Sequence, residues 1–196
     1  LNSLYRQATV LILDEPTAVL TPQEAEELAV TLRGMAAQGK TVVFISHKLE
    51  EVMGVTDRVT VLRQGRKVFE AMTAATSKSE LAREMIGRKL EDLKREQRTF
   101  VLSLAGVGED SPPAAAHQPD KKGATAVLRV HDLCVNDDRD LPACRGISFD
   151  IAAGETVGVA GVDGNGQREL VEVIVGQRRA TSGTITFQGQ DATTWT

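Results

Sequence analysis

Short runs of branched apolar residues alternate with amphipathic stretches along the first part of the chain. Residues 10–13 and 41–46 form two such runs, a pattern typical of strands buried on both faces of a parallel sheet. Between them, Thr21-Pro22-Gln23-Glu24 has the order of a capping box, and an apolar stripe with helical spacing runs from Leu28 to Met35. A strand, a helix and a strand joined by short connections predict a right-handed parallel crossover.

The next stretch of sequence predicts a hairpin and a helix. Residues 58–63 and 67–71 flank Gln64-Gly65, and glycine accepts the positive φ that a tight hairpin turn demands. Residues 79–86 again have a helical pattern. Residues 88–98 are dense in charge of both signs, which we interpret as the solvated face of a helix, with a partner surface as the alternative.

The middle of the chain has the composition of a linker. Residues 105–126 are rich in Gly, Pro and Ala and lack the apolar content needed to build a core. We therefore expect three parts: residues 1–98, a linker at residues 99–125, and residues 126–196. No long internal repeat is visible, so the first and last parts look like complementary pieces rather than copies.

The last part of the chain predicts an antiparallel β unit and a further parallel strand. Residues 126–133 and 146–151 alternate as half-buried strands do, and residues 155–160 form a buried strand that ends at a glycine-rich loop. A helical stripe over residues 169–175 and a strand over residues 184–187 follow. The fold class expected is α/β, with a parallel sheet, flanking helices and an antiparallel β subdomain.

Composition and charge narrow the class of protein. The chain is 41% hydrophobic and 26% charged, as in soluble globular proteins, and its apolar runs are far shorter than the ~20 residues of a membrane-spanning helix. No signal-peptide pattern opens it, so we expect a cytoplasmic protein. The net charge of −4 and the scattered Lys and Arg residues argue against nucleic acid as a partner. Cys134 and Cys144 are expected to be reduced thiols.

Three side chains with catalytic potential follow predicted strands. Asp14 and Glu15 come directly after one buried strand, and His47 comes after the next. The carboxyl ends of parallel strands meet at one edge, where such sheets bind ligands. One carboxylate there can hold Mg²⁺, and a second can orient or deprotonate a water. The alternative is that the acids merely open a surface loop and the histidine caps a helix, but the spacing of all three favours a site.

These residues belong to two longer motifs. The run Leu13-Asp14-Glu15-Pro16-Thr17-Ala18-Val19-Leu20, followed by Ser46-His47-Lys48-Leu49-Glu50-Glu51-Val52, closely resembles the Walker B, D-loop and switch-histidine segments of ABC-type ATPases. The resemblance implies a P-loop NTPase-like fold. It also implies that Asp14 binds the Mg²⁺ of ATP, that Glu15 is the general base for the attacking water, and that His47 contacts the γ-phosphate.

The same resemblance assigns residues 17–21 to the D-loop, which touches the opposite nucleotide-binding domain across a dimer interface. Thr21 stands where many family members carry Asp, so this contact departs from the usual pattern.

A glycine-rich loop, Gly161-Val162-Asp163-Gly164-Asn165-Gly166, lies between a predicted strand and a predicted helix. Backbone N–H groups and the helix dipole can cradle phosphate oxygens there. The Walker A pattern requires Lys and then Ser or Thr after the last glycine, whereas this chain has Gln167 and Arg168. Arg168 is a poor geometric substitute for the lysine. The candidate phosphate-binding residues are Gly161, Gly164, Asn165, Gly166, Gln167 and Arg168.

Residues 158–167 resemble the second domain of tandem ATP-binding subunits of nucleoside and simple-sugar importers, where this loop is often degenerate. The resemblance implies an energy-coupling ATPase that uses ATP and Mg²⁺. Its implied partners are membrane permease subunits and a second nucleotide-binding domain, with an extracellular substrate-binding protein as an indirect partner. The implied location is the inner face of the cell membrane. A non-transport ABC ATPase that acts on nucleic acid or ribosomes and a non-hydrolysing nucleotide-binding module remain alternatives, and the choice between sugar and nucleoside stays open.

The order of the motifs indicates pieces of two consecutive domains, because in a complete domain the phosphate loop precedes the Walker B strand. We therefore expect a fragment, inactive alone, with a lysine-bearing loop before Leu1 and a signature motif beyond Thr196. A further hypothesis is that the two halves pack into a single pseudo-domain, since in the family's sheet the strands that end at Leu13 and Gly161 are expected to be neighbours.

Overall fold

The computed structural model describes residues 8–87, 126–162 and 164–194. The charged run at residues 88–98 and the predicted linker at residues 99–125 lie outside these residues. Among the helices of the described part, none combines the length and the apolar character that crossing a membrane would require.

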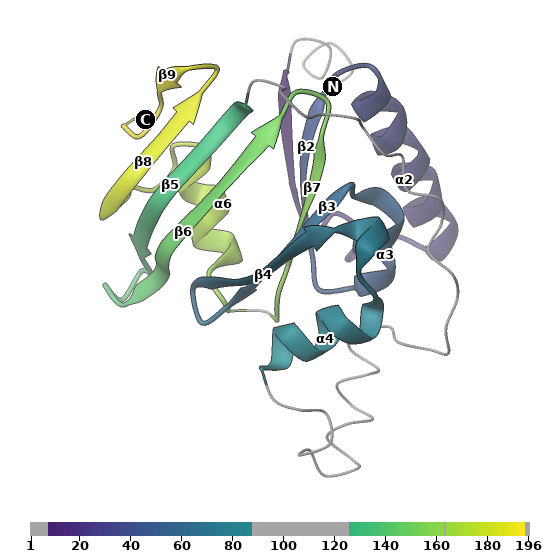
Figure 1. Ribbon diagram of the computed structural model, residues 1–196, viewed down its shortest axis with the longest axis horizontal. Coiled ribbons are helices and arrows are strands. Elements are labelled where there is room, and N and C mark those ends of the chain that lie inside the picture. The colour runs from purple at the N-terminus through teal and green to yellow at the C-terminus, as the bar shows by residue number, and fades with distance from the viewer. Residues whose placement is uncertain (1–7, 88–125, 163, 195–196) are drawn as a thin grey trace.

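A five-stranded sheet forms the centre of the molecule and contains strands from both parts of the chain (Figure 1). Its order is β1-β2-β7-β3-β4. The strands are β1 (Val10–Asp14), β2 (Thr41–Ser46), β7 (Thr156–Ala160), β3 (Arg58–Arg63) and β4 (Arg66–Met72). Strand β7 comes from the later part of the chain, yet it pairs in parallel with both β2 and β3 of the earlier part. The hypothesis of a single packed unit is therefore confirmed.

The reason offered for that hypothesis was wrong in one respect. The strands that end near Leu13 and Gly161 are not neighbours, because β2 lies between them: Ile45 is opposite Asp14 on one side and Val159 on the other. Strand β1 pairs with β2 alone among the described strands and is half-buried. The expectation of full burial on both faces holds for β2, all of whose residues are buried, but not for β1.

Three helices cover one face of this sheet (Figure 1). They are α2 (Pro22–Ala37), α3 (Leu49–Val55) and α4 (Lys78–Ile86), and a short 3-10 turn, η1 (Thr73–Ala75), precedes α4. The N-terminus of α2 confirms the predicted capping box: the Thr21 hydroxyl accepts from the Glu24 N–H at 3.4 Å, and the Glu24 carboxylate accepts from the Thr21 N–H at 2.8 Å.

The other face packs against α6 (Gln167–Ile174) and a second, antiparallel sheet of order β6-β5-β8-β9. Its strands are β5 (Ala126–Asn136), β6 (Pro142–Ala152), β8 (Ser182–Phe187) and β9 (Gln190–Asp191). The predicted antiparallel subdomain is thus present, although its first two strands are longer than predicted. In Figure 1 it lies on the opposite side of the parallel sheet from α2.

The alternation of side chains along β2 shows why its sequence is apolar throughout. Val43 and Ile45 belong to the hydrophobic cluster shared with the antiparallel sheet. Val42 and Phe44 belong to the cluster under the helices. Because neighbouring residues of a strand point to opposite faces, a strand covered on both sides requires apolar residues at every position.

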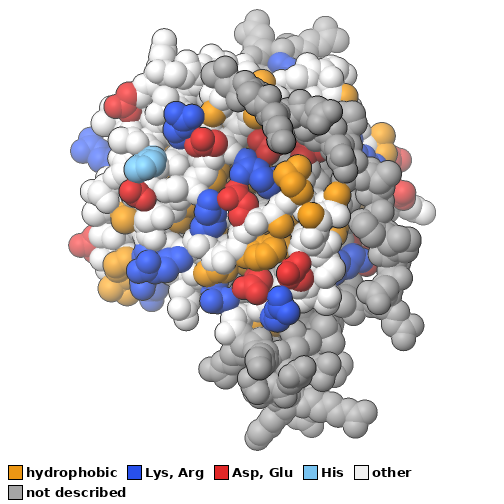
Figure 2. All heavy atoms as spheres, viewed as in Figure 1, with side chains coloured by type: hydrophobic (Ala, Val, Ile, Leu, Met, Phe, Trp, Pro, Cys, Tyr) orange, Lys and Arg blue, Asp and Glu red, His pale blue; other side chains and the backbone are white. Residues whose placement is uncertain are grey.

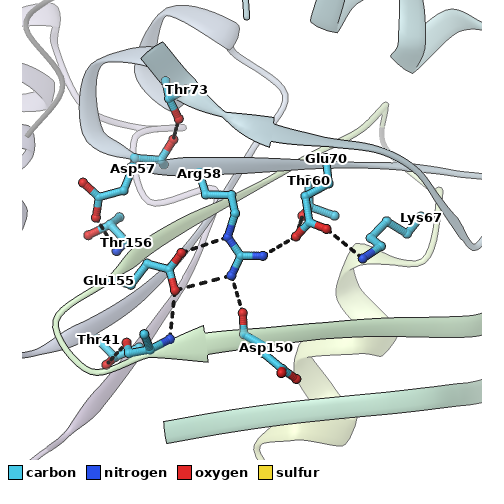
Figure 3. Close-up of polar contacts among 12 residues, drawn as sticks. Thr41, Asp57, Arg58, Thr60, Lys67, Glu70, Thr73, Asp150, Glu155 and Thr156 are labelled. Carbon is cyan, nitrogen blue, oxygen red and sulfur yellow. Dashed lines mark hydrogen bonds and ion pairs between the residues drawn. The ribbon is translucent and has the colours of Figure 1, made fainter. Parts of the chain in front are cut away.

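An ion-pair network joins the two parts of the chain beside β7 (Figure 3). Arg58 Nε donates to Glu155 Oε1 at 2.8 Å, and its Nη1 contacts the Glu70 carboxylate. Asp57 Oδ2 accepts from the Thr156 N–H at 2.9 Å. Elsewhere acidic and basic side chains are interspersed over the face shown in Figure 2. Arg129 forms an exposed ion pair with Asp150 at 3.2 Å.

Candidate functional site

Glu15 and His47 meet at the carboxyl edge of the parallel sheet. His47 Nδ1 lies 2.7 Å from Glu15 Oε1, and the same oxygen accepts the His47 backbone N–H at 3.0 Å. The register causes this meeting, because the Glu15 N–H extends the β1–β2 ladder to the Ile45 carbonyl at 2.9 Å and His47 directly follows β2. The predicted convergence of these two side chains is what the structure shows.

The backbone and the carboxylate of Glu15 both have unusual features. Its φ is 44°, in the left-handed region that non-glycine residues rarely occupy and that recurs at functional sites. Its Oε2 atom is buried and has no hydrogen-bond partner among the described residues. A buried carboxylate oxygen normally accepts a hydrogen bond, so this atom is suited to accept one from a bound water.

Asp14 is the last residue of β1 and is exposed, directly before Glu15. A carboxylate oxygen at a sheet edge has the chemistry that Mg²⁺ prefers. The described residues contain no cluster of three or more metal-ligating side chains. A Mg²⁺ ion in a protein commonly takes one or two carboxylates and completes its shell with phosphates and waters.

The predicted D-loop is fastened to the histidine segment by Glu51, which the sequence analysis did not identify as a site residue. Glu51 Oε2 accepts from the Thr17 hydroxyl at 2.5 Å and from the Ser46 hydroxyl at 3.1 Å. Glu51 Oε1 pairs with Lys48 Nζ at 3.2 Å. No spacing rule marks Glu51, because its contacts come from two segments that only the fold brings together.

The glycine loop leaves the same edge of the sheet, since Ser46 is opposite Ala160 in the β2–β7 register. Gly166 has φ of 96° and precedes α6, as predicted for a strand-loop-helix connection. Asp163 lies outside the described residues.

Two side chains that were candidates for phosphate binding make contacts with the protein itself. Arg168 Nε donates to Glu172 Oε1 at 2.7 Å, one turn along α6, and its side chain is 71% exposed. Gln167 folds back onto the loop, where its Nε2 donates to the Val162 carbonyl at 3.1 Å. The Arg168 side chain is therefore held by Glu172 on the surface of α6.

Comparison with known proteins finds similarity to parts of proteins named as ATP-binding. Residues 144–196 match the family model described as ABC transporter. The chain is 41% identical to the glucose import ATP-binding protein TsgD13 of Haloferax volcanii. The aligned region covers 98% of this chain and 31% of that protein. It is 39% identical to the nucleoside import ATP-binding protein NupA of Lactococcus lactis subsp. cremoris, in an alignment that covers 98% of this chain and 34% of that protein. It is 40% identical to the guanosine import ATP-binding protein NupO of Bacillus subtilis, in an alignment that covers 97% of this chain and 33% of that protein.

Among solved structures, the ADP conformation of an ATP-binding cassette of an ABC transporter is 25% identical, with a TM-score of 0.35, over 36% of this chain and 28% of that one. The chain spans 31–34% of the length of the curated relatives just named. The resemblance predicted from the motifs is confirmed: over nearly its whole length, the chain is homologous to part of the ABC-type ATP-binding proteins of sugar and nucleoside import.

Proposed function

We propose that this chain is part of the ATP-hydrolysing, energy-coupling subunit of an importer for nucleosides or simple sugars. The observation that carries the proposal is the contact of Glu15 with His47 at the carboxyl edge of a parallel sheet. The names of the relatives supply the class of transport, since they import glucose, nucleosides and guanosine. The proposed location is the cytoplasmic face of the membrane, bound to permease subunits.

The roles proposed for the side chains follow from their geometry. Asp14 would hold Mg²⁺, which supplies charge neutralisation to the phosphates when it is bound. Glu15 offers its unpartnered Oε2 to a water as general base, and His47 holds the other carboxylate oxygen in place. His47 would also contact the terminal phosphate through the imidazole nitrogen that does not face Glu15.

The glycine loop fits a nucleotide poorly. It lacks the lysine and the hydroxyl residue of a phosphate loop, and its Gln167 side chain already contacts the loop backbone. Phosphate binding by residues 161–168 remains a prediction from resemblance. We propose that residues 1–98 and 126–196 come from consecutive nucleotide-binding domains joined by residues 99–125.

The test is steady-state ATP hydrolysis by the intact subunit that carries this segment, assembled with its permease in the presence of Mg²⁺. Glu15→Gln keeps the size of the side chain and an oxygen for the His47 contact but removes the basic carboxylate. We expect turnover to fall about 100-fold or more, as for the loss of a general base, while ATP binding persists. Glu26→Gln on the exposed side of α2 is the matched control and should keep wild-type turnover.

Three results would contradict the proposal. Wild-type turnover in Glu15→Gln would remove Glu15 from the chemistry. ATP binding without any hydrolysis in the wild-type assembly would instead identify a nucleotide-binding module that does not hydrolyse. Copurification with nucleic acid, together with ATP turnover that no permease stimulates, would favour a non-transport ATPase.

A further inference from the structure

The side chain of Gln167 lies inside the glycine loop and bonds to it at two points. Its Oε1 accepts the Asn165 N–H at 3.0 Å, and its Nε2 donates to the Val162 carbonyl at 3.1 Å. The residue is only 9% exposed. A Cβ atom added to Gly161 would lie 2.4 Å from Nε2 of Gln167, so the amide is packed directly against the start of the loop.

The chemistry of this contact is that of an internal ligand. A phosphate loop binds its ligand by directing backbone N–H groups at acceptor oxygens. Here the oxygen that receives the Asn165 N–H belongs to the carboxamide of Gln167. A carboxamide carries both an acceptor and a donor, whereas the ammonium of a lysine has no acceptor and could not take this N–H. Having Gln167 where the Walker A pattern has lysine therefore fills the loop with a carboxamide and also leaves it without a cation.

The outer side of the loop holds a second ligand, the turn of the β3–β4 hairpin. Asn165 Oδ1 accepts the Gln64 N–H at 2.6 Å, and the Asn165 carbonyl accepts the Gly65 N–H at 3.2 Å. The Gly65 carbonyl accepts the Arg145 N–H at 2.6 Å, so β6 holds the turn from the other side. The space is tight, since a Cβ atom on Gly65 would lie 2.0 Å from the Ala143 carbonyl oxygen.

We propose that Val162, Asn165 and Gln167 form a clasp in this loop, whose ligands come from the chain itself. The carboxamide of Gln167 occupies the position of an anion, and Asn165 grips the hairpin turn from the other part of the chain. The loop thereby joins the two parts of the sheet and admits phosphate only when Gln167 is displaced. This role goes beyond the proposed ATPase activity, because it concerns the loop and not the site of Glu15 and His47.

The experiment is a titration of the ¹⁵N-labelled chain with inorganic pyrophosphate, followed by amide chemical shifts. In the wild-type chain we expect the amide chemical shifts of Asn165 and Gly166 to remain unchanged at millimolar pyrophosphate. In Gln167→Ala the Asn165 N–H loses its acceptor, and we expect saturable shifts with affinity increased about tenfold or more, the equivalent of one hydrogen bond to a charged group. Gln177→Ala, a change of an exposed glutamine after the same helix, is the matched control and should behave as wild type.

Each other outcome overturns the proposal. Equal shifts in the wild type and in Gln167→Ala would show that Gln167 does not exclude the anion. No shifts in either would show that the loop has no anion position for Gln167 to fill. Gln167→Met keeps the bulk without the amide and replaces the alanine variant if that variant is unfolded. Because the titration requires no ATP hydrolysis, its result can be interpreted in the same way even if the ATPase proposal fails.

Discussion

Arg58 Nε donates to Glu155 Oε1 at 2.8 Å, across 97 positions of sequence, and both side chains are largely buried. The burial of the guanidinium lowers the pKa of Arg58, but the hydrogen bonds and charges of Glu155 and Glu70 together outweigh it, so the pKa is raised overall. Glu155 Oε2 also accepts the Ala152 N–H at 2.8 Å. This pair therefore connects β3 of the earlier part to the turn that leads into β7 (Figure 3).

Removing one member of this pair should destabilise the fold strongly. Arg58→Met keeps the apolar stem but leaves the Glu155 carboxylate, which is 11% exposed, without its cation. We expect the free energy of unfolding to fall by about 3 kcal/mol or more, measured by urea denaturation at neutral pH. Arg129→Met removes the guanidinium of an exposed pair with Asp150 and should cost less than about 1 kcal/mol. Equal losses in the two variants would contradict the role of Arg58.

Acid should weaken the same network through Glu70. Burial raises the pKa of Glu70, but the Lys67 hydrogen bond and the charge of Arg58 outweigh it and lower the pKa below its ordinary value of 4.5. A carboxyl group with a lowered folded-state pKa contributes stability that is fully present above 4.5 and is lost as the pH falls through the folded-state pKa.

Glu70→Gln should therefore cost about 1 kcal/mol at pH 7, the value of a hydrogen bond to a charged group after partial exposure, and almost nothing well below the ordinary pKa. Urea midpoints of both proteins at neutral and acidic pH measure this difference. A cost that does not change with pH would show that Glu70 acts through packing and not through its charge.

Gly65, in the hairpin turn, has the least room for a side chain among the described glycines. It has φ of 73°, and a Cβ atom there would lie 2.0 Å from the Ala143 carbonyl oxygen. Gly65→Ala should cost about 3 kcal/mol, because left-handed strain adds to the displacement of β6. Gly39→Ala has a similar φ of 86° in open space and should cost only about 1 kcal/mol. Thermal unfolding of the two variants separates the steric cost from the conformational one.

Thr21 has a helix-capping role that does not depend on any contact with a partner. Thr21→Ala removes the acceptor for the Glu24 N–H and should lower stability by about 1 kcal/mol, whereas Thr21→Asp keeps an acceptor and should stay within about 0.5 kcal/mol of wild type. Thr31→Ala, within the same helix, should be neutral or slightly stabilising because alanine has the higher helix propensity. Circular dichroism melts of the three variants provide the measurement.

The sequence was sufficient to predict most individual elements. Capping at Thr21 and positive φ at Gly65 are local effects, so the helix and the hairpin that they start could be identified without the fold. The meeting of Glu15 and His47 was also predictable, because parallel strands present their carboxyl ends at one edge. The cap and the turn needed no knowledge of strand order, whereas the meeting of Glu15 and His47 also required their two strands to be neighbours, as the strand-helix-strand pattern predicted.

What escaped prediction depends on strand order and on contacts between distant segments. Nothing in the apolar run at residues 156–160 states that it pairs with β2 and β3, since a buried strand reads the same at any central position. Arg58 and Glu155 resemble ordinary surface charges until the fold brings them together. The role proposed for Gln167 inside the loop could not be predicted, because comparison with the Walker A motif indicates only that the lysine is absent.

The central place of β7 has a consequence for biosynthesis. Strands β2 and β3 are made early, but the strand that joins them ends at Ala160, so a nascent chain must hold two unsatisfied strand edges while nearly a hundred further residues leave the ribosome. Sheets closed by such distant pairings form slowly and expose apolar surface in the meantime. Production of this protein should therefore depend on chaperones more than its size alone would require.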